Sequence, residues 1–118
     1  MLVQLATPTR APAPIWTPVA HEDDIEARSA RTVRYAGVRI ALFRGASGKV
    51  YALEDRCPHK NGPLSEGIVH GERVTCPLHA WVLELRSGEA TGADHGCARS
   101  YPVQVIDGVI YLSLPEVV

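Results

Sequence analysis

Apolar and polar residues alternate with a period of two along much of the chain, and this pattern predicts β-strands. Three stretches carry the signal: VRIALF at 38–43, VYAL at 50–53 after the turn residues GASG, and WVLELR at 81–86. Successive side chains of a strand point to opposite faces, so the alternation places the apolar set on one face. Each stretch is therefore expected to form a half-buried strand.

Two further strands are expected near the end of the chain, joined by a tight turn. The sequences YPVQVI and VIYLSL flank Asp107 and Gly108. A two-residue connection of this kind favours a type I′ turn, because aspartate and glycine tolerate the positive φ angles that it requires. The pattern predicts an antiparallel hairpin over 101–114.

Helix signals are almost absent from the chain. The segment HEDDIEARS at 21–29 is short and charged, and it predicts one helical turn at most. Short strands separated by glycine-rich turns are typical of antiparallel β folds. The expected fold class is all-β, a small antiparallel barrel or sandwich with two loops projecting from it.

The length of 118 residues is enough for one domain with a modest core. Residues 1–14 contain three prolines and no alternation. A flexible extension is expected there, and the ordered domain is expected to comprise residues 15–118.

Charge and cysteine content narrow the class of function. The formal net charge is −1, which disfavours a nucleic acid or an anionic membrane as partner. No apolar run approaches the ~20 residues of a membrane span, and residues 1–14 lack the apolar core of a signal peptide. Three cysteines do not form an even disulfide framework. These features predict a soluble protein of the reducing cytoplasm, with thiols available for metal.

Residues 57–79, CPHKNGPLSEGIVHGERVTCPLH, contain two short motifs that each pair a cysteine with a histidine. Cys57 and His59 form the first pair, and Cys76 and His79 form the second. Two metal centres fit these donors: tetrahedral zinc, and an iron–sulfur cluster in which two histidines replace two cysteines on one iron. Zinc fingers usually group two cysteines and then two histidines, so one of each per loop favours the cluster.

The spacing Cys-x-His, sixteen residues, Cys-x-x-His resembles the motif of Rieske [2Fe-2S] proteins. The resemblance implies a Rieske-type barrel or sandwich in which two loops bind the cluster. It further implies that Cys57 and Cys76 bind the inner iron, and that His59 and His79 bind the outer iron near the surface.

High-potential Rieske proteins of respiratory complexes carry a second cysteine in each loop, and these two cysteines form a disulfide. The matching positions here are Gly62 and Leu78, so that disulfide is not possible. Those proteins also place a serine and a tyrosine after the last histidine to hydrogen-bond the cluster, where this chain has Trp81 and Leu83. The resemblance therefore implies a low-potential centre, toward the bottom of the range of roughly −150 to +300 mV.

Within this class, the segments IWTPV, SGEATG and GCARSYPV resemble the small subunit of bacterial assimilatory NAD(P)H nitrite reductase. The resemblance implies an electron-transfer or docking subunit that is not catalytic alone. Its partner would be a large subunit with flavin, a [4Fe-4S] cluster and sirohaem, which reduces nitrite to ammonium in nitrate assimilation. Two alternatives stay open: a ferredoxin component of an aromatic-ring dioxygenase, and a non-redox docking or zinc-binding module.

Three expectations concern residues near the loops. Trp81 is expected to pack beneath the second loop, and Cys97, which has no cysteine left to pair with, is expected to be a buried structural thiol. A mainly apolar patch around the cluster is expected to dock the partner. This patch comprises Lys60, Asn61, Pro63, Leu64 and residues 78–81.

Overall fold

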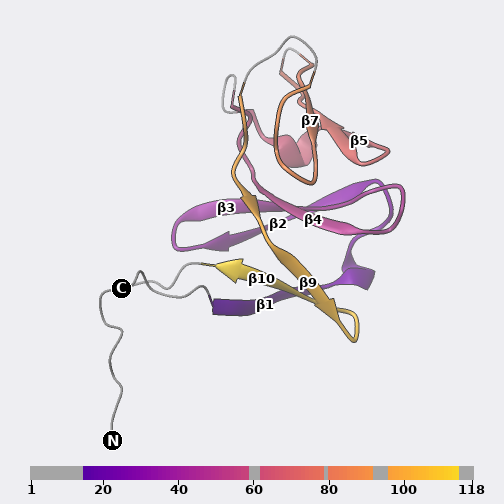
Figure 1. The fold of residues 1–118 in the computed structure, drawn as a ribbon, viewed down its shortest axis with the longest axis vertical. Coiled ribbons are helices and arrows are strands. Elements are labelled where there is room, and N and C mark those ends of the chain that lie inside the picture. Colours follow the sequence, from indigo (N-terminus) through magenta and orange to yellow (C-terminus); the bar gives the residue numbers. More distant parts are fainter. Residues whose placement is uncertain (1–14, 59–61, 79, 92–95, 115–118) are drawn as a thin grey trace, which may run out of the picture.

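The computed structural model describes residues 15–58, 62–78, 80–91 and 96–114, and it is built from three antiparallel sheets (Figure 1). The sheet orders are β1-β10-β9, β2-β3-β4-β8 and β5-β6-β7. The strands are β1 (Ile15–His21), β2 (Ser29–Tyr35), β3 (Val38–Arg44), β4 (Val50–Glu54), β5 (Ile68–His70), β6 (Arg73–Thr75), β7 (Val82–Glu84), β8 (Ser100–Tyr101), β9 (Val103–Ile106) and β10 (Val109–Leu114). Two 3₁₀ turns, η1 (Glu22–Asp24) and η2 (Leu64–Glu66), complete the described elements. The expected all-β class is confirmed.

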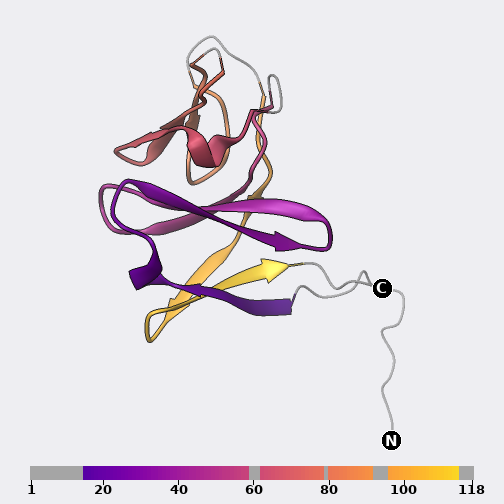
Figure 2. The same cartoon turned by 180° about the vertical axis from the view of Figure 1, so that it is seen from behind.

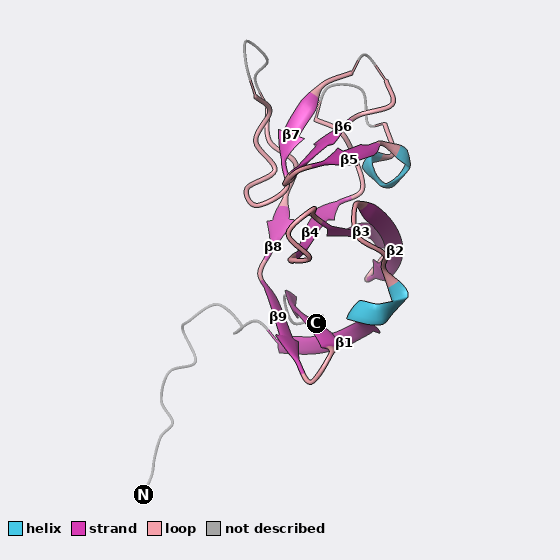
Figure 3. Cartoon of the chain, turned by 90° about the vertical axis from the view of Figure 1, so that its right-hand side faces the viewer, coloured by secondary structure: helices cyan, strands magenta, loops and turns pink. Residues whose placement is uncertain are grey.

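The sheet of β2, β3, β4 and β8 lies between the other two, as the front and rear views show (Figure 1, Figure 2). β8 and β9 follow each other along one side of the molecule and connect this middle sheet with the sheet of β1 and β10 (Figure 3). We call β5, β6 and β7 the cap sheet. Both cysteine–histidine loops adjoin the cap sheet, since the first lies between β4 and β5 and the second between β6 and β7.

The middle sheet is buried on both faces at β3. Ile40, Ala41, Leu42 and Phe43 are all fully buried. The even-numbered residues of this stretch pack in a core shared with β1 and β10, and the odd-numbered residues pack in a core shared with the cap sheet. The expectation of a half-buried strand is therefore wrong at 40–43, where sheets on both sides require apolar side chains on both faces.

Of the other two predicted strands, one is present as expected and the other is shorter. Residues 50–53 lie in β4 as expected, whereas 81–86 yields only the short strand β7. β7 ends early because the chain turns: the amide of Gly88 donates to the carbonyl of Glu84 at 2.7 Å. The expected helical turn is present as η1. In the described ranges, no helix is long and apolar enough to cross a membrane.

The predicted hairpin near the end of the chain is confirmed. Asp107 and Gly108 have φ angles of 51° and 82°, and they join β9 to β10 as a two-residue turn. The strand before the turn is divided at Pro102 into β8 and β9. Proline causes this interruption because it lacks the N–H that a strand ladder uses.

A polar joint fixes the cap sheet to the turn between β3 and β4. The Glu72 carboxylate accepts hydrogen bonds from the amide and hydroxyl of Ser47, at 3.0 and 2.9 Å, and from the hydroxyl of Tyr51 at 2.7 Å. Burial and this carboxylate raise the pKa of Tyr51 to about 12, and the bond from Tyr51 is the main cause that lowers the pKa of Glu72. The joint holds the cap sheet, and with it the loops, in one orientation to the middle sheet.

Candidate metal centre

The first cysteine–histidine loop begins just after β4. Cys57 follows the end of that strand by three residues, and its side chain is fully buried. Its amide donates a hydrogen bond to the carbonyl of Gly62 at 2.8 Å. This bond closes the loop 57–62 into a ring with the cysteine at its base.

The second loop repeats this geometry. Cys76 directly follows β6, is 2% exposed, and donates its amide to the carbonyl of Trp81 at 2.7 Å. In both loops the cysteine amide therefore bonds to the carbonyl five residues further on. Ala80 has a φ of 58°, a left-handed conformation that is costly for a residue with a Cβ and that the surrounding loop imposes.

The two thiols meet in the core beneath the loops. Cys57 and Cys76 are both free thiols and pack in the same buried core. Burial is the main cause that raises the pKa of the Cys76 thiol; the Leu78 amide, 3.4 Å from its Sγ, lowers the pKa, and Cys57 raises it further. Metal binding would remove both protons and compensate the charge of two adjacent thiolates, which is how a buried cysteine pair serves a metal.

The two cysteines could supply half of the ligands of a mixed-ligand cluster. Two buried thiols are ligands that iron–sulfur centres and zinc both accept. In the described part of the chain, no group of three or more histidine, cysteine, aspartate or glutamate side chains is arranged so that it could hold a metal ion. His59 and His79 lie outside the described residues, and their role as ligands stays a prediction.

The two loops approach each other closely at Gly62 and Leu78. A Cβ at Gly62 would lie 3.0 Å from the Sγ of Cys76 and 3.0 Å from Cδ1 of Leu78. The positions at which high-potential Rieske proteins carry their disulfide are therefore neighbours here, occupied by glycine and leucine. The two loops are joined here by packing and not by a covalent bond. Any residue larger than glycine at position 62 would displace the neighbouring side chains.

Trp81 packs against the core that contains both cysteines, as expected. A Cβ at Gly96 would lie 3.0 Å from Cβ of Pro58 and 3.5 Å from the ring of Trp81. The chain at Gly96 therefore lies against both loops, one through Pro58 and the other through Trp81.

Two expectations for residues near the loops are wrong. Leu64, expected on the exposed docking patch, is fully buried in the core with both cysteines, because η2 turns its leucine inward. Cys97, expected to be buried, is exposed, and its thiol donates to the carbonyl of Ser87 at 3.4 Å. Leu78 is 42% exposed and remains on the surface as expected.

A buried carboxylate that the sequence does not single out supports the first loop. Asp55 lies two residues before Cys57 and has a side chain that is 0% exposed. It accepts hydrogen bonds from the amide and the hydroxyl of Ser65, both at 2.7 Å, and pairs with Nε of Arg39 at 3.0 Å. Since Ser65 lies in η2, Asp55 ties together the segments that enter and leave the loop. The sequence feature that could have identified Asp55 is its position at the end of an apolar strand, directly ahead of a ligand motif.

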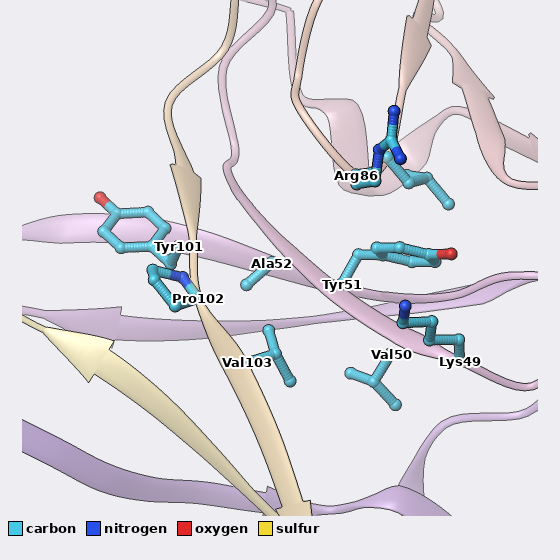
Figure 4. Close-up of a pocket in the computed structure, with 9 residues that line it drawn as sticks. Lys49, Val50, Tyr51, Ala52, Arg86, Tyr101, Pro102 and Val103 are labelled. Carbon is cyan, nitrogen blue, oxygen red and sulfur yellow. The ribbon is translucent and has the colours of Figure 1, made fainter.

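A small hollow of about 160 Å³ lies between β4 and the β8–β9 segment, away from both cysteines (Figure 4). Its walls are mainly apolar and aromatic, and Lys49 lies at its edge. In Figure 4 the guanidinium of Arg86 points away from Ala52 and Val103. The hollow contains none of the predicted ligands, so it is not part of the metal centre.

The chain belongs to the Rieske [2Fe-2S] domain family, whose model matches residues 15–102. The family confirms the [2Fe-2S] cluster as the cofactor and an electron-transfer domain as the class of protein.

Relatives with known functions include oxygenases and ferredoxins. The chain is 36% identical over 108 residues to the 4beta-methylsterol monooxygenase of Methylococcus capsulatus, covering 82% of this chain and 29% of that protein. It is 43% identical over 79 residues to the 3-phenylpropionate/cinnamic acid dioxygenase ferredoxin subunit of Shigella flexneri, covering 65% of this chain and 74% of that subunit. The chain thus spans less than a third of the monooxygenase.

Among solved structures, a ferredoxin is a close structural match. It comes from a complex of reduced oxygenase and oxidized ferredoxin in carbazole 1,9a-dioxygenase, with a TM-score of 0.77 and 25% identity. The match covers 89% of this chain and 99% of that chain. These relatives favour the alternative of a dioxygenase ferredoxin, and they give no support to a nitrite reductase small subunit.

Proposed function

We propose that the chain is a Rieske ferredoxin, which carries one electron at a time from an NAD(P)H-dependent reductase to the oxygenase component of an aromatic-ring dioxygenase system. The observation that carries this proposal is the 43% identity to a dioxygenase ferredoxin subunit over 74% of that subunit's length. The structural match, which extends over 99% of a carbazole dioxygenase ferredoxin, supports it.

We further propose the four ligands. Cys57 and Cys76 would bind the inner iron, and His59 and His79 would bind the outer one. The burial of both thiols in one core supports the first pair, and the position of each histidine within a few residues of its cysteine supports the second. With two neutral imidazoles in place of two thiolates, the cluster accepts an electron at a higher potential than an all-cysteine cluster does.

The described residues serve such a carrier by fixing the loops. The amides of Cys57 and Cys76 close the two rings, and Asp55 and Glu72 anchor them to the rest of the fold. A rigid site changes little when an electron arrives or leaves, and this favours rapid transfer. The Trp81 and Leu83 side chains supply no hydroxyl donor to the cluster, which supports a potential toward the lower end of the Rieske range.

Reconstituted electron transfer tests the proposal. Reduced holoprotein is mixed anaerobically with the purified oxygenase component of 3-phenylpropionate/cinnamic acid dioxygenase, and reoxidation is followed by the cluster's absorbance. In a parallel mixture, the acceptor is the sirohaem-containing large subunit of an NAD(P)H nitrite reductase. Reoxidation by the oxygenase and not by the nitrite reductase is expected. The opposite preference would restore the nitrite reductase hypothesis and overturn this one.

A further inference from the structure

A polar hollow of about 510 Å³ opens on the middle sheet at the point where the chain leaves β4 for the first loop. The turn between β2 and β3 forms one side of it, and the end of β4 forms the other. Three arginines and two acidic residues dominate its lining. The lining residues are Arg34, Gly37, Val38, Arg39, Glu54, Asp55 and Arg56.

The three guanidinium groups of this hollow are exposed, and most of their N–H donors have no partner in the described ranges. Arg39 uses its Nε for Asp55 at 3.0 Å, and Arg56 uses one terminal nitrogen for Glu54 at 3.3 Å. The side chain of Arg34 forms no hydrogen bond or ion pair with any described residue. Since a guanidinium carries several N–H donors in a planar fork, most of the donors in the hollow have no partner among the described residues and could bind an anion.

The register of the sheet places two of these cations opposite each other. Arg34 of β2 and Arg39 of β3 are cross-strand partners, and like charges in this position destabilise a sheet. The fold has no evident use for the Arg34 side chain, because it is exposed and unpaired among the described residues. An anion bound between the two guanidinium groups would remove their repulsion, so binding and stability would be coupled.

The arginines also lie on the correct face of the sheet for contact with a partner near the cluster. On β3 the odd-numbered residues Ala41 and Phe43 pack toward the cap sheet, so Arg39 lies on that face, and its partner Arg34 shares it. Arg56 directly precedes Cys57. The hollow therefore adjoins the first cysteine–histidine loop.

Asp55 fixes the position of Arg39. Its buried carboxylate is held by the amide and hydroxyl of Ser65, and it in turn holds Nε of Arg39. Because the contact to Asp55 is made through Nε, Arg39 is held in place before any partner binds. A preorganised guanidinium loses less conformational entropy on binding, which raises affinity.

We propose that Arg34, Arg39 and Arg56 form a docking site for carboxylates on the surface of the redox partner protein. Planar guanidinium groups bind carboxylates in bidentate geometry, and the open shape of the hollow suits side chains of another protein. The inference rests on the proposed function for the identity of the partner, which is the oxygenase component that accepts the electron. It adds that an acidic partner surface is recognised beside the first loop, with charge steering the encounter.

The first experiment tests the carboxylate site without a partner. Holoprotein labelled with ¹⁵N at arginine is titrated with a hexaglutamate peptide, and the side-chain Nε–Hε signals are followed by NMR, with hexalysine as the control peptide. We expect saturable shifts for Arg34 and Arg39 with hexaglutamate alone. The double variant Arg34→Glu with Arg56→Glu should lose this binding. Unchanged affinity in the double variant would overturn the docking site.

Arg31→Glu is the matched control. Arg31 lies on β2 as well, but an odd number of residues from Arg34, so it projects from the opposite face, where it donates to the carbonyl of Asp24. The same charge change there should leave hexaglutamate binding within about twofold of wild type. Arg34→Glu should also melt no lower than wild type, because it replaces a like-charge cross-strand pair by an opposite-charge pair. Equal loss of binding in Arg31→Glu would mean that net charge, and not this site, attracts the peptide.

The second experiment asks whether the site serves electron transfer. The second-order rate of oxygenase reduction is measured by stopped flow at several ionic strengths. We expect the double variant to react about tenfold or more slowly than wild type at low salt, with the difference shrinking as salt screens the charges. Equal rates at low salt would overturn the role in docking. If wild type reduces no oxygenase while hexaglutamate still binds at the arginines, the proposed function fails and the carboxylate site stands.

Discussion

Replacement of Asp55 by asparagine isolates the role of the buried carboxylate beneath the first loop. The substitution keeps the size of the side chain and removes its charge. The carbonyl oxygen of the new asparagine can still accept one bond from Ser65, but its amide group opposes the N–H donors of Arg39. Both Ser65 bonds are 2.7 Å long and the carboxylate is fully buried, so the loss should be larger than for a surface ion pair.

The expected loss of stability follows from the contacts that the Asp55 carboxylate makes. A hydrogen bond to a charged group contributes about 1.5–3 kcal/mol, and asparagine retains one of the two bonds from Ser65 in uncharged form. The pair with Arg39 adds only about 0–1 kcal/mol, because the arginine side chain is 47% exposed. We expect Asp55→Asn to lower the free energy of unfolding by about 2–3 kcal/mol, since a buried site loses charge-assisted bonds without gaining new ones. Ser65→Ala, which removes the hydroxyl and keeps the amide donor, should cost about 1 kcal/mol.

Urea unfolding of the holoprotein measures these changes in the free energy of unfolding. Far-UV circular dichroism follows the strands, and cluster absorbance follows the loops. With a slope near ~2 kcal/mol/M, the midpoint should fall by about 1 M for Asp55→Asn and by about half as much for Ser65→Ala. Cluster loss to an iron chelator should accelerate in the same order. A midpoint for Asp55→Asn within about 0.2 M of wild type would refute the reasoning, because the carboxylate would then contribute no more than its neutral isostere.

Further predictions test burial, the polar joint, the metal centre and the domain division. Leu64→Ala should destabilise the protein by about 2–5 kcal/mol, whereas Leu78→Ala should cost under about 1 kcal/mol, as thermal melts would show; similar melting temperatures would contradict the burial difference. Because folding raises the pKa of Tyr51 to about 12, the protonated phenol stabilises the fold below about pH 10, and this stability is lost as the pH rises toward about 12. The urea midpoint of Tyr51→Phe should therefore fall less than that of wild type between about pH 9 and 12. Cys76→Ala should lose iron and lower the melting temperature, while strand circular dichroism persists; full iron content would remove Cys76 from the ligands. Limited proteolysis should release fragments of residues 1–14 and leave 15–118 resistant, and early cleavage within the strands would contradict this division.

The sequence was most informative where structure is local. The turn at Asp107 and Gly108 was predictable because two residues that tolerate positive φ leave few choices of hairpin geometry. The Rieske [2Fe-2S] class was predictable because the spacing of the cysteine–histidine motif is contained within two short segments. The strand at 50–53 followed from its alternation between two turns.

The remaining features depend on which segments pack together, and a single strand pattern does not contain this information. β3 alternates in sequence, yet it is buried on both faces because sheets cover it from both sides. Leu64 follows a proline in a loop and looked exposed, but the 3₁₀ turn directs it into the core. The opposition of Arg34 and Arg39 requires the register of β2 and β3, which only the folded sheet reveals.

The most direct test of the central claim is pulsed EPR of the dithionite-reduced protein, purified anaerobically. The account predicts a Rieske-type signal with a low average g and couplings to ¹⁴N from two histidine ligands. His59→Ser and His79→Ser should each abolish these couplings or the signal itself, whereas His70→Ser, a histidine paired with Thr75 on the cap sheet, should leave both unchanged. A spectrum typical of four-cysteine ligation, without nitrogen couplings, or stoichiometric zinc in place of iron, would contradict the account.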